Sequence, residues 1–242
     1  MSKMLKATLL FAAALTVVAC DSGTSTAAPA AKSGSAKPVA AADWSKTVVQ
    51  TPEGGYRMGN PDAKVKLVEF ASLTCSHCRD FHKDSAALKS SYVKSGQVSL
   101  EFRPFMLNIY DFAATKLAIC EGPERFYTWT NELYTNSEAW ITPFTKLTEA
   151  DLNPLRSLPA GDQIKGLAMA GKLNEFAKAR GLPGAKFEAC MADAASFEAL
   201  TKRQQAAVDT YNVQGTPTFL MNGKKIEGTT WAQIEPQIKS AL

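Results

Sequence analysis

Two cysteines, three positions apart, follow directly on a strand-like apolar run and open a stretch with helical spacing. The run covers residues 66–74, and the cysteines are Cys75 and Cys78. The first N–H groups of a helix lack intrahelical partners and the helix dipole is positive there, so a thiolate at that position is stabilised. Because the thiolate is both the nucleophile and the leaving group in thiol–disulfide exchange, this junction predicts a redox centre.

The flanking pattern predicts the local fold around the two cysteines. Residues 65–71 are typical of a strand, apolar positions after Cys75 recur at near-helical spacing until Gly96, and residues 98–103 alternate like a second strand. A strand, a helix and a second strand in this order predict a parallel pair of strands.

The central part of the chain differs from both ends. Residues 108–210 are typical of several helices separated by short Gly and Pro breaks, whereas strand patterns return at residues 218–221 and 225–226 around an Asn-Gly turn. A last helix is expected from about Thr230. We therefore expect one α/β domain with a second, helical domain inserted into it.

The N-terminus has the pattern of an export signal. Two lysines, Lys3 and Lys6, precede an apolar stretch that is too short to span a bilayer well. This stretch ends at residues 17–20, which resemble a bacterial lipobox, so we expect a lipoprotein-type signal peptide over residues 1–19 and a lipid on Cys20. The alternative is an ordinary secretion signal that is cut within the Ala-rich stretch, in which case Cys20 is discarded.

A low-complexity segment follows the signal. It consists almost entirely of Ala, Ser, Thr, Gly, Pro and Lys, cannot bury enough apolar surface to order itself, and predicts a flexible tether over residues 20–46. Asp21 resembles an inner-membrane retention signal. The expected location is the periplasm, with a lipid anchor in the inner membrane. A net charge of +4 without a basic stripe does not favour nucleic-acid binding.

Three features together resemble one family. A CxxC pair at a helix start, a large helical insertion and the later sequence Gly215-Thr216-Pro217-Thr218-Phe219 are similar to the DsbA-like thiol:disulfide oxidoreductases, over about residues 47–242. The resemblance implies a thioredoxin fold, with the thioredoxin-like domain in residues 47–107 and 211–242 and the inserted helical domain in residues 108–210. DsbA itself has Pro at the position of Ser76, so this chain departs from the family pattern between the two cysteines, a position that bears on the redox potential.

The resemblance also implies roles in catalysis. Cys75 is the exposed cysteine that substrate attacks, Cys78 is its buried partner, and His77 supplies a cation beside the Cys75 thiolate. Glu69, within the apolar strand, exchanges protons with Cys78. The alternatives are a structural disulfide or half of a zinc site for the pair, with His77 and His82 as the nearest further ligands, and a solvent-facing carboxylate for Glu69.

The sequence after the insertion predicts a substrate-binding segment. In thioredoxin folds the matching proline is cis and lies beside the redox pair, so Pro217 is counted with the catalytic residues. Gly215, Thr216 and Pro217 are expected to bind substrate, with the Thr216 backbone pairing with an extended peptide as an added strand. The alternative is a plain trans turn.

Two further cysteines lie in the helical region. In an exported protein, leftover cysteines pair more often than they stay free, so Cys120 and Cys190 are expected to form a structural disulfide. Two unrelated buried thiols are the alternative.

The predicted function is a periplasmic dithiol oxidase. It donates the Cys75–Cys78 disulfide to cysteines of newly exported proteins and is reoxidised by a membrane-embedded, quinone-linked, DsbB-like partner. It is expected to be a monomer and to need no cofactor and no metal. One alternative is a reductase or isomerase on the same fold, and another is a non-catalytic tethered module that binds a peptide or a metal.

Overall fold

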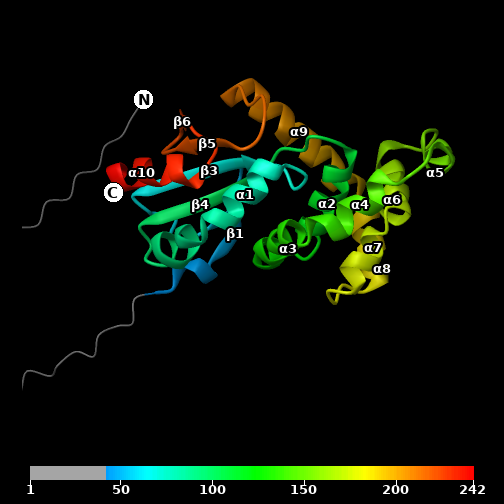
Figure 1. The fold of residues 1–242 in the computed structure, drawn as a ribbon, viewed down its shortest axis with the longest axis horizontal. Coiled ribbons are helices and arrows are strands. Elements are labelled where there is room, and N and C mark those ends of the chain that lie inside the picture. Colours follow the sequence, from blue (N-terminus) through cyan, green and yellow to red (C-terminus); the bar gives the residue numbers. More distant parts are fainter. Residues whose placement is uncertain (1–41) are drawn as a thin grey trace, which may run out of the picture. The chain divides into compact units, whose positions relative to one another are not determined.

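The computed structural model describes residues 42–242, and its core is a six-stranded sheet of order β1-β2-β4-β3-β5-β6 (Figure 1). The β3–β4 pair is parallel and every other neighbouring pair is antiparallel. The strands are β1 (Val48–Gln50), β2 (Tyr56–Met58), β3 (Val65–Ala71), β4 (Val98–Pro104), β5 (Thr218–Met221) and β6 (Lys224–Ile226).

The central position of β3 follows from its composition. Six of its seven residues are buried, and Lys66 is the exception. A strand that is apolar on both faces is stable only when both faces are covered and both edges are paired. β4 pairs with one edge of β3 and β5 with the other, so the end of β3, where Cys75 follows, lies in the middle of the sheet.

One face of the sheet packs on α1 (Ser76–Asp84), the π-helical turn η2 (Leu88–Val93) and α10 (Trp231–Ala241). The ring of Phe81 from α1 lies 4.6 Å from that of Phe219 in β5. The opposite face carries Val68 and Phe70, which form a smaller cluster with Ala207 from α9 (Ala194–Tyr211). Successive residues of a strand point to opposite faces, so Glu69 lies on the α1 side.

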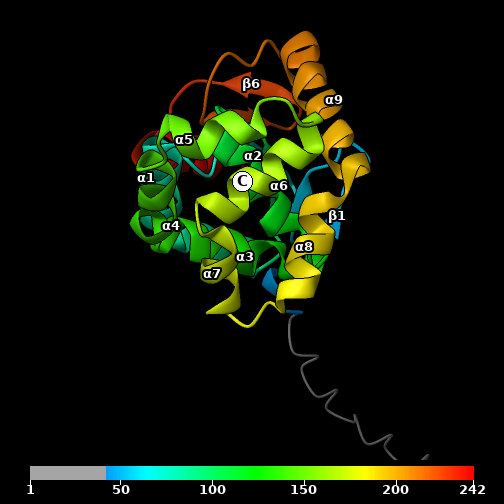
Figure 2. The ribbon, with the colours of Figure 1, turned by 90° about the vertical axis from the view of Figure 1, so that its right-hand side faces the viewer.

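Helices occupy the chain between β4 and β5, and Figure 2 shows several of them from the side. Their buried side chains join the main core through Trp129, Trp140 and Phe144. They are α2 (Ile109–Ile119), α3 (Pro123–Thr135), α4 (Ser137–Thr145), α5 (Glu149–Leu152), the 3₁₀ turn η3 (Asn153–Leu155), α6 (Ala160–Ala170), α7 (Leu173–Lys178), α8 (Gly184–Ala192) and α9.

The α/β fold class predicted from the sequence is confirmed, and the hairpin at Asn222-Gly223 joins β5 to β6 as expected. The single helix expected from Cys75 to Gly96 is wrong, because the helix ends at Asp84 and the chain continues into a separate π-helical turn. Strand β2 was not expected.

The N-terminal predictions lie largely outside the described residues. This applies to the signal peptide over residues 1–19, the lipid on Cys20 and the tether up to residue 41. Residues 44–46, which the prediction assigns to the tether, form the 3₁₀ turn η1 (Trp44–Lys46). The Trp44 backbone N–H donates to the Lys94 carbonyl, so ordered structure begins before Thr47. The division at residues 108 and 210 stays a prediction.

Candidate active site

The cysteine pair lies at the start of α1, just after the short loop that connects β3 to this helix. Cys75 is the N-cap residue of α1, in an extended conformation and without a side-chain cap hydrogen bond, and it is half-buried. Cys78 is fully buried beneath the first turn. Both side chains are free thiols in this structure. One sulfur is therefore accessible to a partner molecule and the other is not.

The environment of Cys75 favours its thiolate. A hydrogen bond from the Cys78 thiol is the largest influence, and together with the Thr216 side chain and the backbone N–H groups of Cys78 and His77 it lowers the pKa of Cys75 to about 5, against the opposing effect of burial. Unpaired N–H groups in the first turn of a helix stabilise an anion in this way. The imidazole of His77 is exposed, and the contribution of this residue to the pKa of Cys75 is its backbone N–H.

Cys78 has the opposite environment. Burial raises the pKa of the Cys78 thiol, and the neighbouring Cys75 and Glu69 raise it further. At neutral pH Cys78 therefore keeps its proton and donates a hydrogen bond to the Cys75 sulfur. The two cysteines differ in protonation because one meets water and helix N–H groups while the other meets only the core.

Glu69 lies in β3 and is 7% exposed. Burial raises the pKa of its carboxyl to about 8, with Lys89 lowering the pKa and Cys75 raising it. Burial in turn lowers the pKa of Lys89 to about 8, and Glu69 partly opposes this. A carboxyl group with a pKa near neutrality, on the α1 face of the sheet, is able to exchange a proton with a nearby thiol. Because Glu69 is buried, the alternative interpretation of this residue as a solvent-facing carboxylate is not favoured.

The segment before β5 meets Cys75 from the other side. The Thr216–Pro217 peptide bond is cis, the geometry expected for this proline. The Cys75 sulfur lies 3.4 Å from the Thr216 carbonyl oxygen, to which the thiol donates a hydrogen bond when it is protonated. Gly215 accepts a hydrogen bond from the Thr218 hydroxyl, which helps to fix the turn. The fold thus brings Thr216 into contact with the Cys75 sulfur, although the two residues are 141 positions apart in the sequence.

The structure joins Cys120 and Cys190 in a disulfide between the end of α2 and α8, with a Cα–Cα distance of 5.5 Å. Both cysteines are partly exposed. One turn earlier on α2, the buried Lys116 donates a hydrogen bond to the carbonyl oxygen of Asp193, the N-cap residue of α9. The bond ties helices together away from the Cys75–Cys78 pair.

Several residues near the pair were missed by sequence reasoning. Lys89 contacts the His82 ring at 3.4 Å and acts electrostatically on Glu69. Asp111 and Tyr134 hydrogen-bond to the loop that precedes Cys75. No local pattern marks these positions, because they come from η2, α2 and α3 and meet only in the folded chain.

The metal-site alternative finds no support within residues 42–242. No group of three or more His, Cys, Asp or Glu side chains in that range is arranged to hold a metal ion. His82 instead faces Asn131, whose side-chain oxygen lies 3.1 Å from its Nε2. Over the same range no helix is both long and apolar enough to cross a bilayer.

Comparison with known proteins agrees with this geometry. The sequence matches the thioredoxin family over residues 51–240, which is most of the chain. The chain belongs to the thioredoxin family. Its fold is also that of the crystal structure of a protein-disulfide isomerase from Novosphingobium aromaticivorans, which is 31% identical, with a TM-score of 0.71 over 76% of this chain and 95% of that one.

Other members are more distant. Wolbachia pipientis alpha-DsbA1, at 20% identity and a TM-score of 0.62 over 80% of this chain and 92% of that one, shares the fold. A Rickettsia bellii protein named "Putative protein-disulfide oxidoreductase" is 23% identical over 81% of this chain and 68% of its own length. A Rickettsia prowazekii relative of the same kind is covered over 65% of its length. These relatives confirm the predicted DsbA-like thioredoxin fold and the dithiol:disulfide oxidoreductase class.

Proposed function

We propose that this protein oxidises cysteines of exported proteins, using Cys75 and Cys78 as the redox pair. The observation that carries the proposal is the contrast between the two thiols. Cys75 is half-exposed with a pKa lowered to about 5, whereas Cys78 is buried with a raised pKa. A thiolate that is stabilised in the dithiol form makes the disulfide form a strong oxidant, because reduction then releases free energy.

The reaction proceeds in two exchanges. A substrate thiolate attacks the Cys75 sulfur of the disulfide form, the Cys75–Cys78 bond breaks, and its electron pair leaves on Cys78, which takes a proton. A second substrate thiolate then attacks the sulfur of the first substrate cysteine in the mixed disulfide, the bond from that sulfur to Cys75 breaks, and Cys75 leaves as a thiolate. The substrate loses two electrons and two protons overall. The pair gains both electrons, Cys78 takes one proton and the other goes to solvent, and the low pKa of Cys75 makes it a good leaving group.

Two neighbouring groups support these steps. Glu69 is buried on the α1 side with a pKa raised to about 8, so it is suited to deliver a proton to Cys78 and to take it back. The Thr216 carbonyl oxygen lies beside Cys75, at the open end of β5, where an extended substrate segment would pair with the backbone. His77 is exposed next to the pair, and its backbone N–H supports the Cys75 thiolate.

The cellular setting of the proposal rests on the N-terminal pattern. A lipid on Cys20 and a tether would hold the enzyme at the periplasmic side of the inner membrane, where exported chains emerge unfolded. Reoxidation of the dithiol would then fall to a membrane-embedded, quinone-linked, DsbB-like partner. Both the anchor and a monomeric state are part of the proposal.

Isomerisation is the second candidate, and one observation favours it. The 31% identical structure from Novosphingobium aromaticivorans is named a protein-disulfide isomerase. An isomerase attacks existing substrate disulfides with its own thiolate, so it works from the dithiol form. The low pKa of Cys75 serves that attack as well. The equilibrium between the dithiol and disulfide forms of the pair therefore decides between an oxidase and an isomerase.

The reduction potential of the pair, measured in glutathione buffers, tests the proposal. A value near about −120 mV places the protein with strong oxidants and supports disulfide donation, whereas about −180 mV favours isomerisation. A value near about −270 mV would mean that electrons flow toward the substrate, and the oxidase proposal would be wrong. Refolding of a reduced substrate and of a scrambled one, with and without Cys75→Ala, gives an independent readout.

A further inference from the structure

One carboxylate from α2 holds the loop that leads into the redox pair. The Asp111 side chain accepts a hydrogen bond from the Leu73 backbone N–H at 3.0 Å and another from the Ser72 hydroxyl. A longer contact of 3.5 Å comes from the Thr74 hydroxyl. These three residues are the last before Cys75, so the carboxylate is fastened to the segment that determines where the first cysteine lies.

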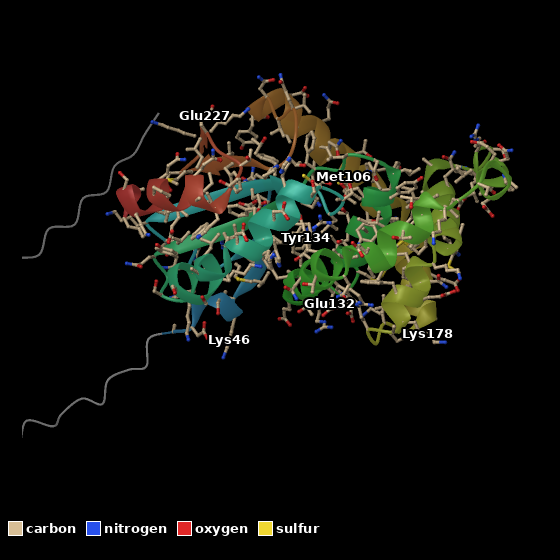
Figure 3. All side chains as sticks on the ribbon, viewed as in Figure 1. Lys46, Met106, Glu132, Tyr134, Lys178 and Glu227 are labelled. Atoms are coloured by element: carbon tan, nitrogen blue, oxygen red, sulfur yellow. A yellow bond between two sulfur atoms is a disulfide. The ribbon has the colours of Figure 1, made fainter. Side chains whose placement is uncertain are left out.

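The same carboxylate also fixes the chain after β4. It accepts the Leu107 backbone N–H at 3.0 Å, and the Asn108 amide group next to it donates to the Thr74 hydroxyl at 3.0 Å. Asp111 thereby joins two loops that follow the neighbouring parallel strands β3 and β4. Figure 3 labels Met106, which lies in the loop after β4, and Tyr134, whose hydroxyl donates to the loop after β3.

Tyr134 adds a third tie from α3. Its hydroxyl donates to the Ser72 carbonyl oxygen at 2.9 Å. Ser72 is therefore held from two helices, through its hydroxyl by Asp111 and through its carbonyl by Tyr134. The orientation of Cys75 and Cys78 relative to each other depends on this loop, because the Ser72 backbone also contacts Cys78.

The Asp111 carboxylate is unusual for a structural residue. It is fully buried, and no ion pair joins it to a cation among the described residues. As the third residue of α2, an acidic side chain usually reaches back to the N-cap backbone as a capping box. Here the cap is made by the Asn108 side chain alone, and the Asp111 carboxylate turns to the active-site loop.

We propose that Asp111 is a positioning residue for the redox pair, which holds the residue 72–74 loop so that the Cys78 thiol and the first helical N–H groups point at the Cys75 sulfur. The inference rests on the proposed function of Cys75 as the attacking thiolate. A neutral side chain at residue 111 lacks one acceptor oxygen, so the loop loosens and the thiolate loses aligned donors. The pKa of Cys75 then rises, although the loss of a nearby negative charge alone would lower it.

The test compares Asp111→Asn with Asp193→Ala in the full chain. Asp193 caps α9 by accepting two backbone N–H groups, and none of its described hydrogen bonds involves residues 72–74, so its removal costs stability while the hydrogen bonds of the active-site loop remain. Thiolate absorbance at 240 nm against pH reports the pKa of Cys75, and urea unfolding reports stability. We expect Asp111→Asn to raise the pKa by at least about half a unit, about threefold in ionisation, and Asp193→Ala to leave it unchanged.

A second variant covers the case in which Asp111→Asn does not fold. Tyr134→Phe removes only the hydroxyl that reaches Ser72, and it is expected to move the Cys75 pKa in the same direction by a smaller amount. An unchanged or lowered pKa in whichever variants fold would overturn the positioning role. If the pKa of Cys75 in the unaltered protein is not depressed at all, it is the proposed function that fails, and the two failures are thereby distinguished.

Discussion

At the scale of single residues, two cysteines that lie three positions apart in the sequence have pKa values shifted in opposite directions. Cys75 caps a helix and has a lowered pKa, while Cys78 is buried by the core and has a raised one. The largest influence on Cys75 is the thiol of Cys78 itself. The reactive cysteine therefore depends on its partner even in the dithiol form, when no bond joins them.

Substitution of Cys78 tests this dependence. Cys78→Ala removes the hydrogen-bond donor, so we expect the pKa of Cys75 to rise by about one unit or more. Cys78→Ser is the matched control, because its hydroxyl still donates, and we expect it to keep most of the depression. Iodoacetamide trapping of Cys75 against pH measures both variants. Equal pKa values for the two would show that the N–H groups of the helix, and not Cys78, hold the thiolate.

Glu69 predicts a pH dependence of stability. Its carboxyl has a pKa of about 8 in the fold and the ordinary 4.5 in the unfolded chain, so the folded state binds more protons between these values. The free energy of unfolding therefore falls as pH rises from about 4.5 to about 8. Glu69→Gln cannot ionise, and its stability relative to the unaltered protein should improve on the order of 3 kcal/mol between pH 4 and pH 9.

Urea unfolding at the two pH values measures the Glu69 effect. Glu198→Gln, at an exposed position of α9, serves as the control and should show no such trend. If Glu69→Gln follows the pH dependence of the unaltered protein, the carboxyl is already ionised in the fold and its proposed exchange with Cys78 has no basis.

At the scale of secondary-structure elements, the Cys120–Cys190 bond joins α2 to α8 across a separation of 70 residues. Its removal by Cys120→Ser together with Cys190→Ser should lower the free energy of unfolding by about 3–5 kcal/mol, because the unfolded chain regains the freedom of a long loop. Urea unfolding under non-reducing conditions measures this loss. The pKa of Cys75 should not move, and a shift would mean that the bond influences the active site.

The elements also show what the sequence could and could not predict. The redox junction, the late return to strands and the Asn222-Gly223 hairpin depend on local patterns, and each was predicted. The break after Asp84 was not, because the apolar spacing continues through Leu88 without a Gly or Pro to interrupt it. Asp111 was missed because its partners lie 37–39 positions away, and its own surroundings show only a helix start.

At the scale of the whole molecule, the redox state should change global stability. The Cys75 thiol has a pKa of about 5 in the fold and 9.0 as its ordinary value, so the thiolate stabilises the dithiol form. This stabilisation is complete above pH 9 and is lost as pH falls through 5. The disulfide form has no Cys75 thiolate and therefore lacks this stabilisation.

We therefore expect the dithiol form to be more stable than the disulfide form at pH 7 by about 1–2 kcal/mol from this source, discounted for the half-exposed position of Cys75. The difference should narrow between pH 7 and pH 4. Thermal unfolding of both forms across this range measures it, with mass spectrometry to verify that the Cys120–Cys190 bond is intact in each. A constant difference would contradict the origin in Cys75.

The contact between Cys75 and Thr216 has a consequence for biosynthesis. A chain that emerges with its N-terminus first presents β3 and both thiols while β5, α10 and the Thr216 carbonyl are still to be made. The two cysteines are then ordinary thiols on an incomplete sheet. The segment synthesised last completes the site around the two sulfurs, so a truncated or incompletely synthesised chain has both cysteines but lacks the complete active site.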